Sequence, residues 1–223
     1  MTDMSQIPPS PEQGHVVDMR AGKRASLMIR SAKLICQSGE YPCIVRDVSS
    51  GGCKLRFFNA MPPETYVLLE LANGETFAMK RVWNRDLEAG FQFTAPIDVE
   101  AFIEESSPHP RRPVRLRIRT GMRVWADGKG IEGVLRDIGT GGIGLALASE
   151  LALRQPVRLA IPGIPDCYAR VAWRRGASHG LVFEHQLKMN ELAQWALALQ
   201  PFLPPAQVAA TQLFEELPRR YTA

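Results

Sequence analysis

The sequence predicts a mainly β protein that consists of two tandem small antiparallel β-barrels, each followed by an α-helix. Three observations support this fold class. Short runs that alternate between apolar and polar residues recur along the 223-residue chain, with turn residues between them. The same residue pattern appears twice at an offset of 90. A segment with helical periodicity ends each copy, and a chain of this length accommodates two domains of about 100 residues.

The repeat rests on seven residue pairs whose numbers differ by 90. They are Asp47 and Asp137, Gly52 and Gly142, Val67 and Val157, Leu69 and Leu159, Trp83 and Trp173, Gly90 and Gly180, and Phe93 and Phe183. Seven matches at a single offset are hard to obtain by chance, so the copies are expected to be tandem domains of the same fold.

Within the first copy, period-two alternation predicts strands over residues 53–57, 67–72, 77–83 and 90–93. The Asn73–Gly74 pair predicts a tight hairpin between two of them. Roughly five to seven short strands per copy fit a small barrel, because closure removes exposed sheet edges.

A helix is expected after the strands of each copy. In the first, Asp98 can cap a helix that begins at Val99 and places Phe102 and Ile103 on its inner face. In the second, apolar residues recur at helical spacing at Leu192, Trp195, Leu199 and Phe202.

These elements define the predicted domain organisation. The two domains are assigned to residues 18–105 and 109–203, and a proline- and arginine-rich linker over 106–115 joins them. We expect residues 1–17 to be a disordered tail. The C-terminal tail, 204–223, contains a candidate short amphipathic helix.

Composition argues against several classes of protein. With 45% hydrophobic and 22% charged residues, the chain is typical of globular soluble proteins. It shows no secretory signal pattern, and no stretch reaches the roughly 20 apolar residues of a membrane span. We therefore expect a cytosolic protein.

Cysteine usage and sequence motifs favour neither a metal site nor an enzyme. We expect the four cysteines, at positions 36, 43, 53 and 167, to be buried small apolar side chains instead of zinc ligands or a disulfide framework. No nucleophile-elbow, phosphate-loop or HExxH motif occurs. The sequence thus predicts no catalytic residues, no metal and no cofactor.

Each copy carries a second repeated signal upstream of its aspartate. Two arginines lie four residues apart, Arg20 and Arg24 in the first copy, Arg111 and Arg115 in the second. The second arginine precedes the aspartate by 23 residues in the first copy and by 22 in the second. An Asp-x-small-x-x-Gly motif then follows at the end of a predicted strand.

These residue types suit a ligand that carries both guanine and phosphate. Guanidinium groups clamp phosphates, stack on purines or donate to guanine O6 and N7. The Asp47 carboxylate can accept hydrogen bonds from the opposite guanine edge, and Ser49 lies two residues on, on the same strand face. Gly51 and Gly52 let the backbone turn and a ligand approach.

Together the motifs resemble the PilZ domain, the bacterial receptor module for cyclic di-GMP. The first copy matches its RxxxR and DxSxxG patterns and the later V-x-W…G-x-x-F stretch, at Arg20, Arg24, Asp47, Ser49, Gly52, Val82, Trp83, Gly90 and Phe93. The second matches at Arg111, Arg115, Asp137 and Gly142, but Gly139 stands where the family has serine. The resemblance implies that the arginine segment wraps the ligand on the barrel's outer face, with Asp47 and Ser49 contacting guanine.

The expected function is therefore a bacterial cyclic di-GMP receptor that changes conformation on binding and signals to a protein partner. The missing hydroxyl at Gly139 would cost roughly 0.5–1.5 kcal/mol, or about 2- to 12-fold in affinity. A second domain with a purely structural role therefore stays open. Two alternatives for the whole chain are a ligand-free protein-interaction module and, less favoured, a nucleic-acid-binding barrel. Trp83 and Trp173 are expected in the core.

Overall fold

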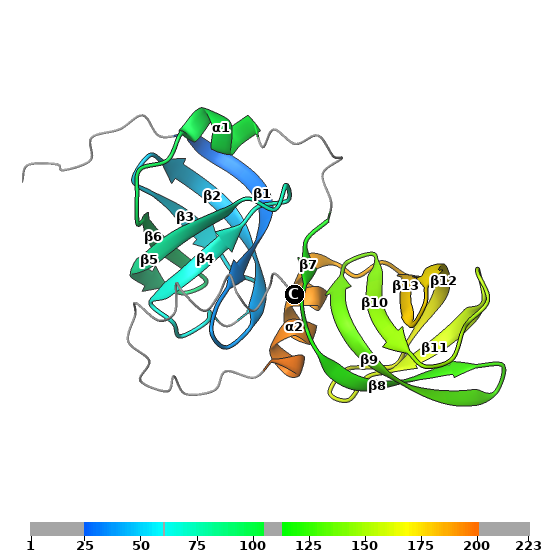
Figure 1. Ribbon diagram of the computed structural model, residues 1–223. Helices are drawn as coiled ribbons and strands as arrows, with labels where there is room; N and C mark the ends of the chain where they lie inside the picture. Colours follow the sequence, from blue (N-terminus) through cyan, green and yellow to red (C-terminus); the bar gives the residue numbers. More distant parts are fainter. Residues whose placement is uncertain (1–24, 60, 105–112, 201–223) are drawn as a thin grey trace, which may run out of the picture.

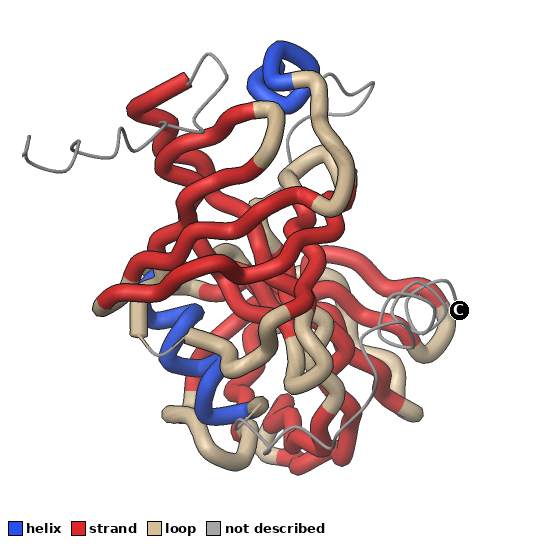
Figure 2. The backbone as a smooth tube through the Cα atoms, turned by 90° about the vertical axis from the view of Figure 1, so that its left-hand side faces the viewer, coloured by secondary structure: helices blue, strands red, loops and turns tan. Residues whose placement is uncertain are grey.

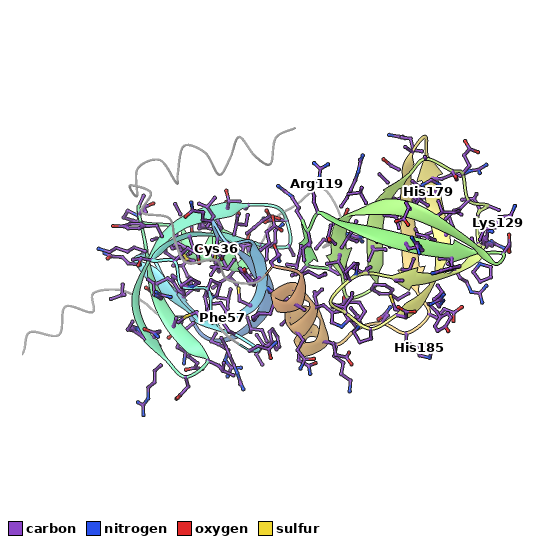
Figure 3. All side chains as sticks on the ribbon, turned by 90° about the horizontal axis from the view of Figure 1, so that it is seen from below. Cys36, Phe57, Arg119, Lys129, His179 and His185 are labelled. Carbon is purple, nitrogen blue, oxygen red and sulfur yellow. The ribbon has the colours of Figure 1, made fainter. Side chains whose placement is uncertain are left out.

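The computed structural model describes residues 25–59, 61–104 and 113–200, which form two β-barrels (Figure 1). The two barrels lie side by side, and the helix that ends the second barrel lies between them (Figures 1 and 3). The predicted fold class of two small antiparallel barrels is confirmed. The tails and most of the predicted linker lie outside the described residues.

Six strands close the first barrel in the order β1-β2-β3-β6-β5-β4. They are β1 (Ala25–Ile35), β2 (Glu40–Ser49), β3 (Gly52–Arg56), β4 (Tyr66–Glu70), β5 (Thr76–Arg85) and β6 (Glu88–Phe93). Helix α1 (Val99–Glu104) follows. Neighbouring strands pair antiparallel throughout, so the four strands predicted in this copy are confirmed.

The second barrel repeats this arrangement with one interruption. Its elements are β7 (Arg115–Leu116), β8 (Thr120–Ala126), β9 (Lys129–Gly139), β10 (Gly142–Leu147), β11 (Pro156–Ala160), β12 (Cys167–Arg175), β13 (Ser178–Phe183) and helix α2 (Met189–Leu199). Strands β8 to β13 close the barrel, and the short β7 pairs with the end of β9. The pair β7 and β8 takes the place of β1.

The interruption explains the unequal motif spacing. In the first barrel Ala25 lies opposite Val48, and in the second Leu116 lies opposite Ile138, the residue at the repeat offset. Four residues separate Ala25 from Arg30, which lies opposite Val45, whereas three separate Leu116 from Thr120, which lies opposite Leu135. The register shift in β1 thus accounts for a spacing of 23 instead of 22.

Two local features of the sequence, a turn pair and a helix cap, adopt the structures that were predicted for them. The N–H group of Glu75 donates to Asn73 Oδ1 over 3.0 Å, and Gly74 adopts φ 88°, so the hairpin is confirmed. Asp98 Oδ1 accepts from the N–H groups of Glu100 and Ala101, at 2.9 and 3.2 Å, and caps α1.

Each helix packs an apolar face against its barrel and lies outside the strands (Figure 2). The Phe102 ring of α1 lies 5.0 Å from Phe77 and 6.2 Å from Phe93 between ring centres. In α2, Leu192 is fully buried and Trp195 meets Phe183 edge-on at 6.0 Å. The helix predictions are confirmed, except for Phe202, which lies outside the described residues.

The cysteines behave as apolar side chains. Cys36, Cys43 and Cys53 are buried and Cys167 is half-buried. Burial, with Asp166 nearby, raises the pKa of Cys167 to about 11, and burial raises the pKa of the other thiols as well. Within the described ranges no group of His, Cys, Asp and Glu is arranged to hold a metal ion. No helix in those ranges is long and apolar enough to cross a membrane.

The end of α2 joins the two barrels. The main chain of Glu40 in β2 donates to Gln200 Oε1 and accepts from Gln200 Nε2, both at 2.9 Å. The Tyr41 hydroxyl also donates to the main-chain oxygen of Gln200 at 3.0 Å. Gly39 permits this contact, because a Cβ there would overlap the Gln200 side chain. The second barrel is therefore anchored to β2 of the first.

Candidate ligand-binding site

A hollow of about 530 Å³ opens on the first barrel beside the turn from β2 to β3. Its lining contains four residues predicted for the site, namely Asp47, Ser49, Gly51 and Gly52. Val48, Cys53, Lys54, Trp83 and Gly90 complete the lining. The structure therefore brings together the described part of the predicted first site.

A bulge in β2 shapes the start of the motif. Val45 pairs with Leu55, but Asp47 pairs with Lys54, so Arg46 is an extra residue on β2. The second barrel has the same irregularity, since Leu135 pairs with Leu145 and Asp137 with Gly144. A bulge re-aims the side chains that follow it. Both motif aspartates follow such a bulge.

The Asp47 carboxylate is the main polar feature of the hollow. Its Oδ1 atom is buried and has no hydrogen-bond partner within the described residues. An acceptor in this condition costs free energy unless a donor reaches it. The arrangement therefore favours a donor that comes from a ligand or from a segment outside the described residues.

The other motif residues have separate roles. The Ser49 hydroxyl donates to the Gly52 main-chain oxygen at 3.2 Å within the turn. A Cβ at Gly51 would meet nothing within 4 Å, so the space above it is open. A Cβ at Gly52 would overlap the Phe91 carbonyl oxygen, and the close approach of β3 to β6 therefore requires glycine there. Sheet packing accounts for Gly52, which was predicted to allow a ligand to approach.

The prediction that Trp83 and Trp173 lie in the core is wrong. Their exposed fractions are 44% and 52%. The register shifts between Arg81 and Trp83, and a bulge of this kind interrupts the period-two alternation on which the prediction depended. The exposed Trp83 indole lies against Gly90, where a Cβ would overlap the ring, and lines the hollow.

Lys54 is a further residue of the hollow that the sequence reasoning missed. It lies opposite Asp47 across the strand pair, and its Nζ is 3.3 Å from Glu88 Oε2. The cross-strand position could not be assigned from sequence, because the bulge at Arg46 changes the pairing by one residue. Lys54 places an ammonium group, which is of a type that binds phosphate, in the lining of the hollow.

Three of the four predicted arginines, Arg20, Arg24 and Arg111, lie outside the described residues. The strand register nevertheless relates the two copies. Arg115 lies opposite Gly139, the residue that corresponds to Ser49. In the first copy the residue before Ala25 is Arg24, and Ala25 lies opposite Val48. Arg24 thus holds the sequence position that corresponds to Arg115.

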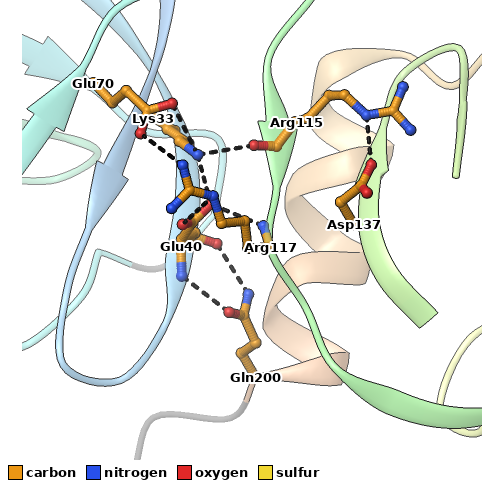
Figure 4. Close-up of polar contacts among 7 residues, drawn as sticks. All are labelled: Lys33, Glu40, Glu70, Arg115, Arg117, Asp137 and Gln200. Carbon is orange, nitrogen blue, oxygen red and sulfur yellow. Dashed lines mark hydrogen bonds and ion pairs between the residues drawn. The ribbon is translucent and has the colours of Figure 1, made fainter. Parts of the chain in front are cut away.

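At the second predicted site the arginine and the aspartate form an ion pair with each other. Arg115 Nε lies 2.5 Å from Asp137 Oδ1 (Figure 4). Opposite Asp137 stands Gly144, and a Cβ there would overlap the Asp137 carboxylate, so this acid lies over bare backbone. The first barrel has Lys54 at that position. The two sites therefore differ in charge as well as at position 139.

The glycines of the second motif serve strand packing. A Cβ at Gly142 would overlap the Leu181 carbonyl oxygen, as at Gly52. A Cβ at Gly139 would lie 2.8 Å from the Val114 carbonyl oxygen and 3.2 Å from Arg115 Cγ. Glycine at 139 thus lets β7 lie close to β9. The missing serine hydroxyl is linked to the placement of the arginine strand.

Comparison with known proteins finds solved structures that are similar to this chain at low sequence identity. The chain is similar to the PlzA protein of Borreliella burgdorferi in complex with c-di-GMP, at 10% identity and a TM-score of 0.33, over 80% of this chain and 94% of that one. It is similar to the inhibitor of motility MotI/DgrA of Bacillus subtilis at 14% identity and a TM-score of 0.33, over 76% and 95%. It is also similar to YcgR of Escherichia coli in complex with c-di-GMP, at 12% identity and a TM-score of 0.28, over 86% and 87%. No curated protein matches the chain.

A family match identifies the second barrel. Residues 109–197 match the model of the PilZ domain, a range that contains every element from β7 to most of α2. The second barrel is therefore a PilZ domain, and the resemblance read from the motifs is confirmed. The first barrel has the same strand arrangement and carries the more complete set of motif residues.

Proposed function

We propose that the chain is a bacterial receptor for cyclic di-GMP that recognises its ligand without chemical change and passes the signal to a protein partner. The observation that carries the proposal is the buried, unpartnered Asp47 oxygen among the residues of the hollow in the first barrel. The PilZ match of the second barrel supports the same ligand class.

The groups around the hollow suit guanine and phosphate. The Asp47 carboxylate can accept hydrogen bonds from guanine N1 and N2, and the Trp83 ring offers a face for stacking. Lys54 supplies a cation for phosphate, and we assign the same task to Arg20 and Arg24. A hollow of about 530 Å³ lies within the usual range for small-molecule sites. Each role is one of binding, so we propose no catalytic function.

We assign the second site a weaker affinity than the first. A ligand there must compete with Asp137 for the Arg115 guanidinium, since the two groups already form an ion pair. It would also find no hydroxyl at Gly139 and no lysine at Gly144. Arg111 and Gly142 belong to this proposed site as well. The first barrel is therefore the principal receptor site in this proposal.

Calorimetric titration with cyclic di-GMP, GTP and cyclic AMP tests the ligand assignment. We expect saturable binding of cyclic di-GMP and at least tenfold weaker binding of the other two, because they offer only part of the guanine and phosphate set. Equal binding of all three, with a strong salt dependence, would instead favour a general anion or nucleic-acid surface. If none of the three binds, the ligand-free protein-interaction module would be the remaining alternative.

The proposed conformational change can be tested separately. Arg115 lies at the junction of the barrels and already pairs with Asp137, so a ligand that draws its side chain away should change how the linker is held between them. Small-angle scattering with and without saturating cyclic di-GMP should then show a change of shape in the wild type. The change should be lost in Arg115→Ala, and a change that persists there would rule out the linker route.

A further inference from the structure

Four charged residues meet between the two barrels, namely Lys33, Glu40, Glu70 and Arg117 (Figure 4). Lys33 of β1 is 4% exposed and Glu40 of β2 is 0% exposed. Lys33 Nζ lies 2.8 Å from Glu40 Oε2 and 3.0 Å from Glu70 Oε1. Lysine and glutamate are almost never this deeply buried unless they are paired. The burial of Lys33 and Glu40 therefore depends on the ion pairs that Lys33 forms with Glu40 and Glu70.

The cluster holds the chain where it enters the second barrel. Lys33 Nζ donates a third bond to the main-chain oxygen of Arg115, at 3.1 Å. The N–H group of Arg117 donates to Glu40 Oε2 at 2.8 Å. The Arg117 guanidinium also lies 3.8 Å from Glu70 Oε2. The first barrel thus binds the main chain of Arg115 and of Arg117, on either side of Leu116.

Arg115 takes part in both the interface and the second site. Its main chain accepts from Lys33 of the first barrel, while its side chain pairs with Asp137 of the second, as Figure 4 shows. Its own strand gives it little other support, because β7 has two residues and two ladder partners, Gly139 and Ile138. A segment this short needs contacts from outside the sheet to keep its position.

We infer that Lys33 is a positioning residue for Arg115, so that the second ligand site is complete only while the first barrel is docked against it. The inference rests on the proposed function in one respect, namely that Arg115 and Asp137 contact the ligand. Lys33 does not touch that ligand. It fixes the main chain from which the guanidinium extends, and such placement governs how well a charged group meets its partner.

Other contacts between the barrels allow the positioning role of Lys33 to be distinguished from docking of the barrels in general. Gln200 holds the main chain of Glu40 through two further hydrogen bonds, and Tyr41 holds Gln200. These contacts do not involve the Lys33 ammonium. Loss of Lys33 should therefore release Arg115 while α2 still anchors the barrels. By linkage, a ligand at the second site should also strengthen the contact between the barrels.

The test uses the full chain with Lys33→Met and Glu40→Gln combined, because removing Lys33 alone would leave the fully buried Glu40 carboxylate without its nearest cation. The control is Lys129→Met, at the exposed tip of the β8–β9 hairpin (Figure 3). The first readout needs no ligand. Exchange of the Arg115 Nε–H proton with water, followed by ¹⁵N NMR and assigned with Arg115→Lys, should be at least threefold faster in the double variant, since its bond to Asp137 is weakened. It should be unchanged in the control.

The second readout measures binding when the first site has been weakened. In an Asp47→Ala background, which weakens the first site, the double variant should bind cyclic di-GMP about tenfold more weakly than the background protein. If the background protein binds no cyclic di-GMP, the proposed second ligand site fails, and the proton exchange still decides the role of Lys33. Arg115 exchange that stays slow in the double variant would overturn the inference.

Discussion

Asp47 on β2 lies directly opposite Lys54 on β3. In the second barrel the corresponding pair is Asp137 and Gly144. The first barrel therefore keeps a lysine beside its motif acid. In the second barrel the acid lies over bare backbone and pairs with Arg115. Two copies of one fold thus place their motif acids beside different charged groups.

Asp47→Ala should weaken the binding of cyclic di-GMP at the first site at least tenfold, because a desolvated charged partner typically contributes several kcal/mol. The apo protein should melt at nearly the wild-type temperature, since Oδ1 has no partner within the described residues. Calorimetry and thermal unfolding check the two parts. Asp86→Asn is the matched control, because its side chain is 89% exposed. Wild-type affinity in Asp47→Ala would place the site elsewhere.

Trp83 should report ligand binding through its fluorescence. The ring lines the hollow and is partly exposed, so a stacked guanine should change its emission. Trp83→Phe should remove most of the ligand-induced signal. Trp125→Phe should retain it, because that ring lies on the second barrel beneath Arg158, at 5.0 Å. A signal that is unchanged by Trp83→Phe would show that the ligand does not reach the hollow.

Gly139→Ser should destabilise the protein instead of repairing the second site. The new Cβ would lie 2.8 Å from the Val114 carbonyl oxygen, so β7 must shift. We expect a loss of about 1–3 kcal/mol in the free energy of unfolding, measured with urea, and no gain in affinity. Gly141→Ser is the control, since a Cβ there meets nothing within 4 Å. A tighter second site in a stable Gly139→Ser protein would show that β7 can move without penalty.

Glu40 should give the interface a measurable pH dependence. Burial raises its pKa above the ordinary value of 4.5, although Lys33 and Arg117 oppose the shift. The folded protein therefore binds this proton more tightly than the unfolded chain does. The Glu40 contribution is fully present below pH 4.5 and is lost as pH rises through the raised pKa.

The comparison with Glu40→Gln isolates this effect from other carboxylates. Urea unfolding of both proteins at several pH values should show the wild type losing stability relative to the variant as pH rises above 4.5. A difference that changes in the opposite direction would mean that Lys33 outweighs burial, and one that stays constant with pH would mean that the two effects on the Glu40 pKa cancel.

The strands, the hairpin and the cap of α1 were predictable because their signals are local. Asn73–Gly74 and Asp98 act within three residues of themselves, and the repeat places the second copy by its offset from the first. The motif aspartates and Ser49 could be proposed as candidates, since their spacing alone marks them. These features need no knowledge of distant contacts.

The remaining features depend on contacts across the sheet or between the barrels. Trp83 faces outward because of a register shift, and Lys54 joins the hollow because a bulge places it opposite Asp47. Lys33 meets the Arg115 carbonyl across 82 positions of sequence. No periodic pattern in the sequence predicts this contact. It arises when two folded barrels dock.

The most direct measurement is a crystal structure of the chain grown with cyclic di-GMP. The account predicts a guanine whose N1 and N2 atoms lie within hydrogen-bond distance of the Asp47 carboxylate, with its base near the Trp83 ring and phosphate toward Lys54. It also predicts that Asp47 Oδ1, buried without a partner in the described residues, gains a donor from the ligand. A saturated complex whose ligand lies away from this hollow would contradict the account.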